Sequence, residues 1–258
     1  MPSVQRMIRA LGQGLLLLGF AIFDLSALAD SVWVSELQNE VTRGQVDKIK
    51  EDLVAAEKTG AALFVLRIDT PGGEMEATRI LVQAILDSPV PVAAYVAPAG
   101  ARASSAGTYI LSAAHIAAMS PATNIGSAKP IVLSFGDVDE DMKQKFQNDA
   151  AAQLRALAQL RGRNAEWLTE SVTKAENITS SEALELGLID LIAVNQNDLL
   201  KQLNGRSVSL GDAELVLDTQ NLEPVSSKPF ENFSWVTIWL LFGIGLIVLE
   251  LVLTSFIS

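Results

Sequence analysis

Two adjacent serines, Ser104 and Ser105, are the residues whose type and setting most favour covalent chemistry. They stand in a run of small residues, Gly100-Ala-Arg-Ala-Ser-Ser-Ala-Gly-Thr-Tyr109, between the strand-like Pro91–Val96 and the helix-like Thr108–Ala113. A serine hydroxyl at such a junction can attack a carbonyl carbon while the unpaired amides and the dipole of the helix stabilise the resulting oxyanion. Serine is also a preferred N-cap residue, so this stretch alone leaves a purely structural role open.

A glycine pair after an earlier apolar segment offers a place for such an oxyanion. Ala61–Ile68 is almost unbroken in its apolar character, which is typical of a strand buried on both faces, and it leads into Asp69-Thr-Pro-Gly-Gly73. Glycine leaves its backbone amide unobstructed, so Gly72 and Gly73 could donate hydrogen bonds to a charged oxygen near a neighbouring strand end. By itself, however, the motif is only a turn.

A serine nucleophile also needs a group that accepts its proton, and few side chains here qualify. The sequence has no cysteine and a single histidine, His115, which falls in a strand-like segment where a lone histidine is more often structural. The remaining candidates are lysines. A lysine amine acts as a base near neutral pH only where burial disfavours its charged form, so we expect a catalytic lysine to be desolvated.

Alternating strand-like and helix-like segments must position these residues, and they predict an α/β fold. Helix-like segments repeat apolar residues every three or four positions. Thr42 with Gln45, and Thr179 with Glu182, have the spacing of capping boxes, and Asn164 can cap a further helix. The expected strands are Val32–Val34, Ala61–Ile68, Pro91–Val96, His115–Met119 and Leu188–Val194, with weaker ones around Val208 and Leu215–Leu217.

Two segments after the serines extend this pattern. Pro121-Ala-Thr-Asn-Ile-Gly126 is rich in turn formers and predicts a tight loop, whereas the acidic run Asp137–Asp141 favours the N-terminus of a helix. Because Lys145 follows that run, we expect it in the first turns of the helix.

Composition limits the class of protein. With 258 residues, 49% of them hydrophobic, the chain can bury a core without a metal or a disulfide. The formal net charge of −11 and the total of only 19 lysines and arginines argue against a nucleic-acid partner, which needs a clustered basic surface. The absence of cysteine excludes disulfides, cysteine nucleophiles and thiolate metal sites, and we expect neither a cofactor nor a metal.

Both ends of the chain are apolar and predict association with a membrane. Residues 1–29 have the pattern of an export signal peptide, although Asp24 makes an uncleaved anchor the alternative. We assign residues 30–223 to one soluble domain, 224–234 to a linker and 235–257 to a transmembrane helix. Glu250 is costly inside hydrocarbon, so we expect it either to face another helix or to lie near the membrane boundary. A chain that ends soon after this glutamate could be a fragment of a longer protein.

Several motifs occur in a fixed order between roughly Val32 and Leu203. They are Asp69-Thr-Pro-Gly-Gly73, Ala103-Ser-Ser-Ala-Gly-Thr-Tyr109, Asn124-Ile-Gly126, Lys145-Phe-Gln-Asn-Asp149 through Gly162-Arg-Asn164, and Ser181-Glu-Ala-Leu-Glu-Leu-Gly-Leu-Ile-Asp190. Together they resemble the nodulation efficiency protein D (NfeD) family of membrane-bound serine proteases. That family is similar to the Clp protease proteolytic subunit and the crotonase superfamily, which implies an α/β domain of repeated strand–strand–helix units.

The resemblance implies a Ser–Lys dyad with Ser105 as nucleophile and Lys145 as base. It implies an oxyanion hole formed by the backbone amides of Gly72, Gly73 and Ala106. A catalytic lysine in place of histidine is consistent with a chain that has a single histidine.

By the same resemblance, Lys129 and Lys143 are ordinary solvated charges. The expected function is a membrane-anchored serine endopeptidase that cleaves apolar segments of stomatin-like membrane proteins. The expected partners are a stomatin-like protein, a peptide substrate, the lipid bilayer and further copies of the chain in a homo-oligomer. We expect the domain on the periplasmic side of the inner membrane.

Two rival functions are open at this point. A crotonase-like acyl-CoA enzyme would use the same glycine amides to hold a thioester oxyanion, but export would separate it from cytoplasmic CoA. A non-catalytic membrane scaffold that partners stomatin-like proteins is the second alternative. The presence of both Ser105 and Lys145 counts against that scaffold.

Overall fold

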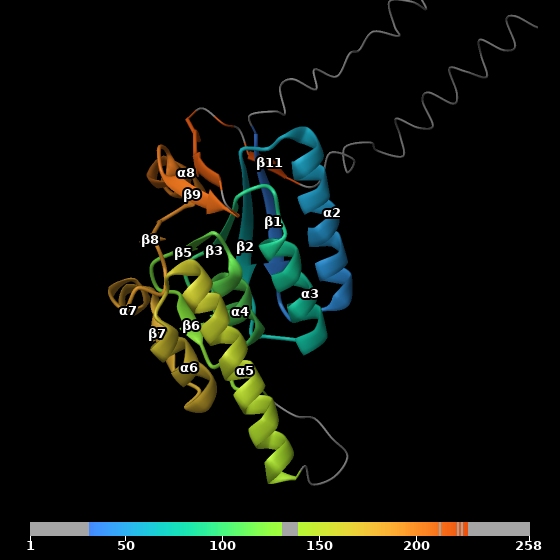
Figure 1. Cartoon of the computed structure of the whole chain (residues 1–258). Helices are drawn as coiled ribbons and strands as arrows, with labels where there is room; N and C mark the ends of the chain where they lie inside the picture. The colour runs from blue at the N-terminus through green and yellow to red at the C-terminus, as the bar shows by residue number, and fades with distance from the viewer. Residues whose placement is uncertain (1–30, 131–138, 212, 221, 223, 227–258) are drawn as a thin grey trace, which may run out of the picture. The chain divides into compact units, whose positions relative to one another are not determined.

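The computed structural model describes residues 31–130 and 139–226, apart from 212, 221 and 223 (Figure 1). The predicted signal peptide and transmembrane helix fall outside these residues, and the described part of the chain contains no helix long and apolar enough to cross a bilayer. The strands are β1 (Val32–Gln38), β2 (Leu63–Asp69), β3 (Val92–Val96), β4 (Arg102–Ser104), β5 (Ile116–Met119), β6 (Asn124–Gly126), β7 (Asn177–Thr179), β8 (Leu191–Ile192), β9 (Ser207–Leu210), β10 (Ala213–Val216) and β11 (Pro224–Ser226). The helices are α2 (Arg43–Thr59), α3 (Met75–Leu86), α4 (Ala106–Ala113), α5 (Glu140–Arg161), α6 (Ala165–Thr173), α7 (Ser180–Glu185) and α8 (Gln196–Leu203).

A six-stranded sheet in the order β11-β1-β2-β3-β5-β8 forms the centre of the domain. From β1 to β8 the neighbouring strands are parallel, so their carboxyl ends lie along one edge. Along the chain, β3, β4 and α4, and then β5, β6 and α5, each place two strands before a helix. The predicted α/β class is therefore confirmed.

Different elements cover the two faces of this sheet, because successive residues of a strand point to opposite faces. In β2, Phe64 and Leu66 belong to a buried cluster with residues of α2 to α6, whereas Leu63 and Val65 pack in a second cluster with residues of α8 and β9. In Figure 1, α2 to α5 accordingly lie on one side of the sheet and α8 on the other. The prediction that Ala61–Ile68 contains a strand buried on both faces is confirmed.

Local capping signals identified three helices correctly. The side chain of Thr42 caps α2, and that of Asn164 caps α6. Thr179 and Glu182 form a complete, reciprocal capping box before α7. Before α2 only half of the box forms, since the side chain of Gln45 donates to a backbone carbonyl of β1 instead of the cap.

Other segments differ from the predictions. Asn124–Gly126, expected in a loop, forms β6, and Pro224–Ser226, expected to begin the linker, forms β11 at the edge of the main sheet. Leu188–Val194 yields only the two-residue β8, and the helix α8 was not predicted. Strands β6 and β11 depend on partners distant in sequence, which local composition does not indicate. Helix α8 did have a local signal, because Asn195 caps it.

A small second sheet, β4-β6-β7, is built at the carboxyl edge of the main sheet. Strand β4 follows β3, and β6 follows β5. Thr70, directly after β2, bridges to Ala103 of β4. The segments after three central strands therefore meet at the edge where α/β proteins commonly hold their functional sites.

His115 lies at the opposite, amino edge of the sheet. It directly precedes β5, and its Nδ1 accepts a hydrogen bond of 3.2 Å from the Val92 amide at the start of β3. Burial, followed by the positive charges of Arg161 and Arg163, lowers the pKa of His115 to about 4. The ring is therefore neutral near pH 7 and links two strands, as expected for a structural histidine.

Acid should destabilise the domain through this histidine. Between pH 6.5 and 4 the unfolded chain binds a proton at His115 that the folded chain excludes, so the free energy of unfolding should fall as the pH falls through this window. Because solvent partly screens the ring, we expect a loss of roughly 2 kcal/mol. His115→Asn keeps an acceptor for Val92 and removes the titration, so urea unfolding should show a flatter pH dependence. An unchanged slope would contradict this assignment.

Candidate active site

Ser105 joins β4 to α4 in an unusual backbone conformation, with φ 50° and ψ −112°. This lies outside the extended region normal for N-cap residues, and its side chain makes no capping hydrogen bond. Its amide donates to the Gly126 carbonyl (2.9 Å), and its carbonyl accepts from the Thr108 amide (2.9 Å). Capping therefore does not explain the serine, and a strained residue held in this way is typical of a functional site.

Gly72 lies directly against Ser105. A Cβ added at Gly72 would stand 2.8 Å from the Cβ of Ser105 and 3.2 Å from its Oγ, so no side chain fits there. The φ of Gly72 is +128°, a further reason for glycine. Its amide is already used, because it donates to Thr70 Oγ1 (3.1 Å). Gly72 therefore allows close approach to the serine, and its amide is not free for the oxyanion role that we expected.

The amides of Gly73 and Ala106 remain as candidate oxyanion donors. Within the described residues neither has a hydrogen-bond acceptor. Ala106 opens α4, so its amide lies in the first turn, at the positive end of the helix dipole. Its nitrogen is 3.7 Å from the position that a Gly72 Cβ would take. Ala106 directly follows Ser105, and Gly73 directly follows Gly72, which contacts the serine, so two of the three predicted donors have N–H groups without an acceptor among the described residues.

The residues around Ser105 explain why its motif is rich in small side chains. A Cβ at Gly107 would stand 2.8 Å from Thr70 Cγ2 and 3.2 Å from the Cβ of Ala103, so only glycine lets α4 begin here. The hydroxyl of Thr108 lies 3.0 Å from the carbonyls of both Ala103 and Gly126. These contacts pack the start of α4 against β4 and β6.

Lys145 does not contact Ser105 through any hydrogen bond in the described structure. It lies in the second turn of α5, as predicted, but its side chain is exposed and has no hydrogen-bond or ion-pair partner among the described residues. The expected desolvation is therefore absent from this arrangement. Met142 and Phe146, also on α5, are exposed apolar neighbours.

The other two lysines are as expected. Lys129 is exposed, and Lys143 pairs with Glu140 on the surface of α5.

Thr70 is a site residue that the sequence analysis missed. It is fully buried, and besides accepting from the Gly72 amide its hydroxyl donates to the Asn39 carbonyl (2.5 Å). Its position within Asp69-Thr-Pro-Gly-Gly73 could have indicated this role. A threonine hydroxyl in a turn can form a hydrogen bond with the backbone of the residue two positions later.

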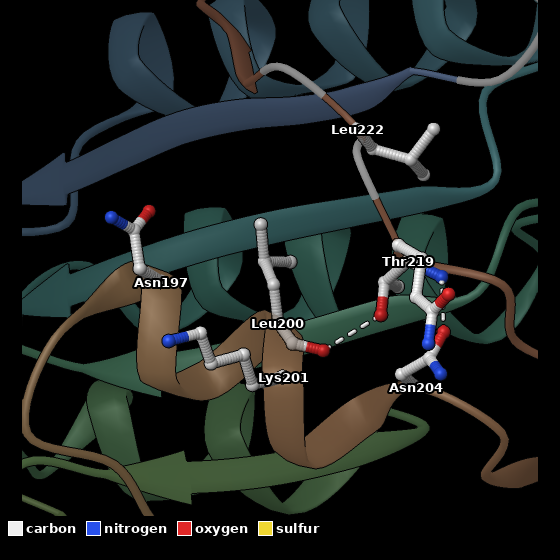
Figure 2. A pocket seen from close by; sticks show the side chains of 7 residues that line it. Asn197, Leu200, Lys201, Asn204, Thr219 and Leu222 are labelled. Atoms are coloured by element: carbon white, nitrogen blue, oxygen red, sulfur yellow. Dashed lines mark hydrogen bonds between the residues drawn. The ribbon is translucent and has the colours of Figure 1, made fainter.

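A pocket of about 350 Å³ lies elsewhere, beside α8 (Figure 2). Inside it, the hydroxyl of Thr219 donates to the Leu200 carbonyl (2.7 Å), and the amide of Thr219 donates to the side chain of Asn204 (3.0 Å). None of the predicted site residues lines it. The pocket is lined by Asn197, Leu200, Lys201, Asn204, Thr219, Gln220 and Leu222.

The described ranges contain no group of three or more His, Asp or Glu side chains that could hold a metal ion.

The sequence profile of a known family, the N-terminal domain of NfeD1b, matches residues 31–213. The chain belongs to this family. A relative of this NfeD1b-type domain, the membrane-bound protease PH1510 of Pyrococcus horikoshii, is 38% identical over 181 residues, which cover 69% of the chain and 41% of that protein. The membrane protein NfeD1b of Bacillus subtilis is 28% identical over 222 residues, or 80% and 49%. The chain thus spans less than half of each relative.

Solved structures of a protein described as the 1510-N membrane-bound stomatin-specific protease match the NfeD1b-type domain. One, a variant with an alanine in place of a serine, gives a TM-score of 0.72 at 34% identity, covering 78% of this chain and 98% of that chain. Another, with an alanine in place of a lysine and a bound substrate peptide, gives 0.71 at 33% identity, covering 81% and 98%. The mixed α/β fold with its parallel sheet is therefore that of 1510-N.

Gly72→Ala should distort the site and destabilise the domain. The new methyl group meets Ser105 and also forces alanine to a positive φ, so we expect a loss of about 1–3 kcal/mol in chemical denaturation. Gly100→Ala is the matched control, because Gly100 has a φ of +88° with nothing within 4 Å. It incurs backbone strain alone, so equal losses in the two variants would argue against the close contact with Ser105.

Proposed function

We propose that this domain is a serine endopeptidase in which Ser105 is the nucleophile. The observation that carries the proposal is the hydroxyl of Ser105 on its strained backbone, near the amides of Gly73 and Ala106, none of which has a hydrogen-bond partner in the described part of the chain. A carbonyl oxygen that develops negative charge there would meet two N–H donors and the positive end of α4. These groups would stabilise the transition state more than the substrate.

The reaction is acyl transfer in two steps. A base removes the proton from Ser105 Oγ as the oxygen bonds to the peptide carbonyl carbon, and the same proton then leaves with the amine of the departing peptide. Water subsequently breaks the acyl–serine ester and restores the hydroxyl. The oxyanion of each tetrahedral intermediate would be held by the Gly73 and Ala106 amides.

Lys145 is the base in this proposal. Support comes from its place in the family motif and from the relative 1510-N, whose lysine-to-alanine variant is described in complex with a substrate peptide. The amine must lose water to become a base, and the exposed side chains of Met142 and Phe146 give an apolar partner something to pack on near it. An apolar peptide, or another copy of the chain in a homo-oligomer, would desolvate Lys145 by covering this surface.

The proposed substrate is an apolar segment of a stomatin-like membrane protein. The 1510-N relative is described as stomatin-specific, and both curated relatives are described as membrane proteins. The predicted signal peptide and transmembrane segment would hold the domain on the periplasmic side of the inner membrane.

A non-catalytic scaffold is the alternative function. One observation favours it, because Lys145 is exposed and has no partner within the described residues. A domain that only binds a stomatin-like partner would have no need to bring this amine to the serine.

Removing either member of the dyad should abolish peptide hydrolysis. Ser105→Ala and Lys145→Ala should each lower kcat/KM by roughly 10³-fold or more, since nucleophile and base act as one unit. For the same reason the double variant should be no worse than either single variant. The measurement is turnover of a fluorogenic peptide by the full chain in detergent.

Ser104→Ala and His115→Asn are the matched controls, because neither residue belongs to the proposed dyad. Both should retain activity, and circular dichroism should show that all variants are folded. Wild-type turnover by Ser105→Ala would reject the proposal and favour the scaffold. Loss of activity in folded His115→Asn would instead indicate a histidine base.

Apolar peptides should be cleaved better than charged ones of equal length, by roughly tenfold in kcat/KM. Three exposed apolar side chains could contact such a peptide. Met75 begins α3, two residues after Gly73, and Met142 and Phe146 lie on α5 near Lys145. Competition between paired peptide libraries in one reaction, read by mass spectrometry, measures the preference directly. Equal or preferential cleavage of the charged library would contradict it.

A further inference from the structure

Arg163 is a buried cation whose contacts converge on the far end of the serine-bearing helix. Its Nη1 donates to the carbonyls of Ser112 (2.7 Å) and Ala114 (3.1 Å), and its Nη2 donates to Ala114 (3.1 Å). The side chain is 5% exposed. Arg161 adds a bond from Nε to the Ala113 carbonyl (2.8 Å). Three consecutive carbonyls at the end of α4 therefore accept hydrogen bonds from two arginines.

Asp190 holds Arg163 in place. One oxygen of its carboxylate, Oδ2, accepts from Arg163 Nη2 (3.3 Å) and from the Ala117 amide of β5 (2.8 Å). The other oxygen accepts from Arg206 (3.1 Å). Because Ala117 belongs to the central sheet, the guanidinium of Arg163 is tied through Asp190 to that sheet.

These contacts connect the two helices that carry the proposed dyad. Helix α4 has eight residues, so its arginine-bound end is only about 12 Å from Ser105. Helix α5 ends at Arg161, 16 residues after Lys145, which corresponds to about 24 Å. A rotation of about 5° at that end would move Lys145 by about 2 Å. Displacements of this size cost catalysts on the order of 100-fold or more in rate.

A stabilising role alone is a weak explanation for this arrangement. Burial lowers the pKa of Arg163, although Asp190 opposes that shift, so the charge is desolvated at a cost. Buried ion pairs often contribute little net stability compared with apolar residues of similar volume, and they can instead specify one geometry. The last carbonyls of a buried helix need donors within the protein, but neutral N–H or O–H groups can supply these without burying a charge.

We propose that Arg163, held by Asp190, is a positioning residue that sets where Ser105 and Lys145 stand relative to each other. The proposal rests on the Ser–Lys function argued above. Arg163 does not touch substrate in this role. It acts through the end of α4 and through the junction between α5 and α6.

Arg163→Met tests the proposal, since it keeps an apolar stem of similar length and removes the guanidinium. In the full chain, kcat for an apolar peptide should fall by about 10- to 100-fold, with KM within about twofold. Arg206→Gln is the matched control, because it also removes a cation from Asp190 but does not touch α4. It should leave kcat within about twofold of the wild type.

A second measurement reports the position of helix α5 relative to helix α2. The chain has no cysteine, so spin labels can be placed on cysteines introduced at Gln144 of α5 and Glu51 of α2, both exposed. Diluting the labelled chain with unlabelled wild type makes the signal report the distance within one chain. Pulsed electron resonance should give a broader or shifted distance in Arg163→Met and an unchanged one in Arg206→Gln. A merely stabilising role would lower the melting temperature and leave the distance and kcat unchanged, which would overturn the proposal.

The two proposals can fail separately. If the wild type hydrolyses no peptide while Arg163→Met broadens the distance, the serine protease function fails and the positioning of the helices by Arg163 stands. If Arg163→Met does not fold, Arg163→Lys decides, since an ammonium keeps the charge but has one nitrogen with three donors in place of the planar fork that makes four bonds from two nitrogens. A folded lysine variant with wild-type kcat and distance would overturn the proposal.

Discussion

The contact between Gly72 and Ser105 is the constraint on which the candidate site depends. It requires the segment after β2 to pass within van der Waals distance of the segment after β3. Parallel pairing brings those segments to one edge of the sheet, and Gly126, after β5, supplies the carbonyl that holds the Ser105 amide. The strained conformation of Ser105 persists because neighbours on several sides determine it.

Helix α4 has ends of opposite character, although all eight of its residues are buried. The carbonyls at its C-terminal end are satisfied within the protein by Arg161 and Arg163. At its N-terminal end, the Ala106 amide has no acceptor among the described residues. A helix buried along its whole length thus presents one polar end to a ligand. The arginines complement its negative end, and a developing oxyanion would complement its positive end.

The parts of the site that sequence could predict are those encoded locally. The turn at the glycine pair, the start of a helix after Ser105 and the caps at Asn164 and Thr179 depend on neighbouring residues and were predicted correctly. Strand β4, which precedes the serine, was not predicted. The surroundings of Lys145 depend on what covers α5, which no local pattern specifies. The different roles of Gly72 and Gly73 could not be predicted either, because they follow from a hydrogen bond to the buried hydroxyl of Thr70.

The strands around Ser105 are distant in sequence, and this has a consequence for the nascent chain. Val41 donates to the Gly72 carbonyl, and Gly126 packs against the Glu176 carbonyl, so the two glycines that contact the serine are held by residues far apart in the chain. Such long-range contacts form late in folding, after the cost of closing long loops has been met. An incompletely folded chain therefore lacks the arrangement of Gly73 and Ala106 amides that the proposed reaction of Ser105 requires. The proposed activity would therefore appear only once strands and helices distant in sequence have come together.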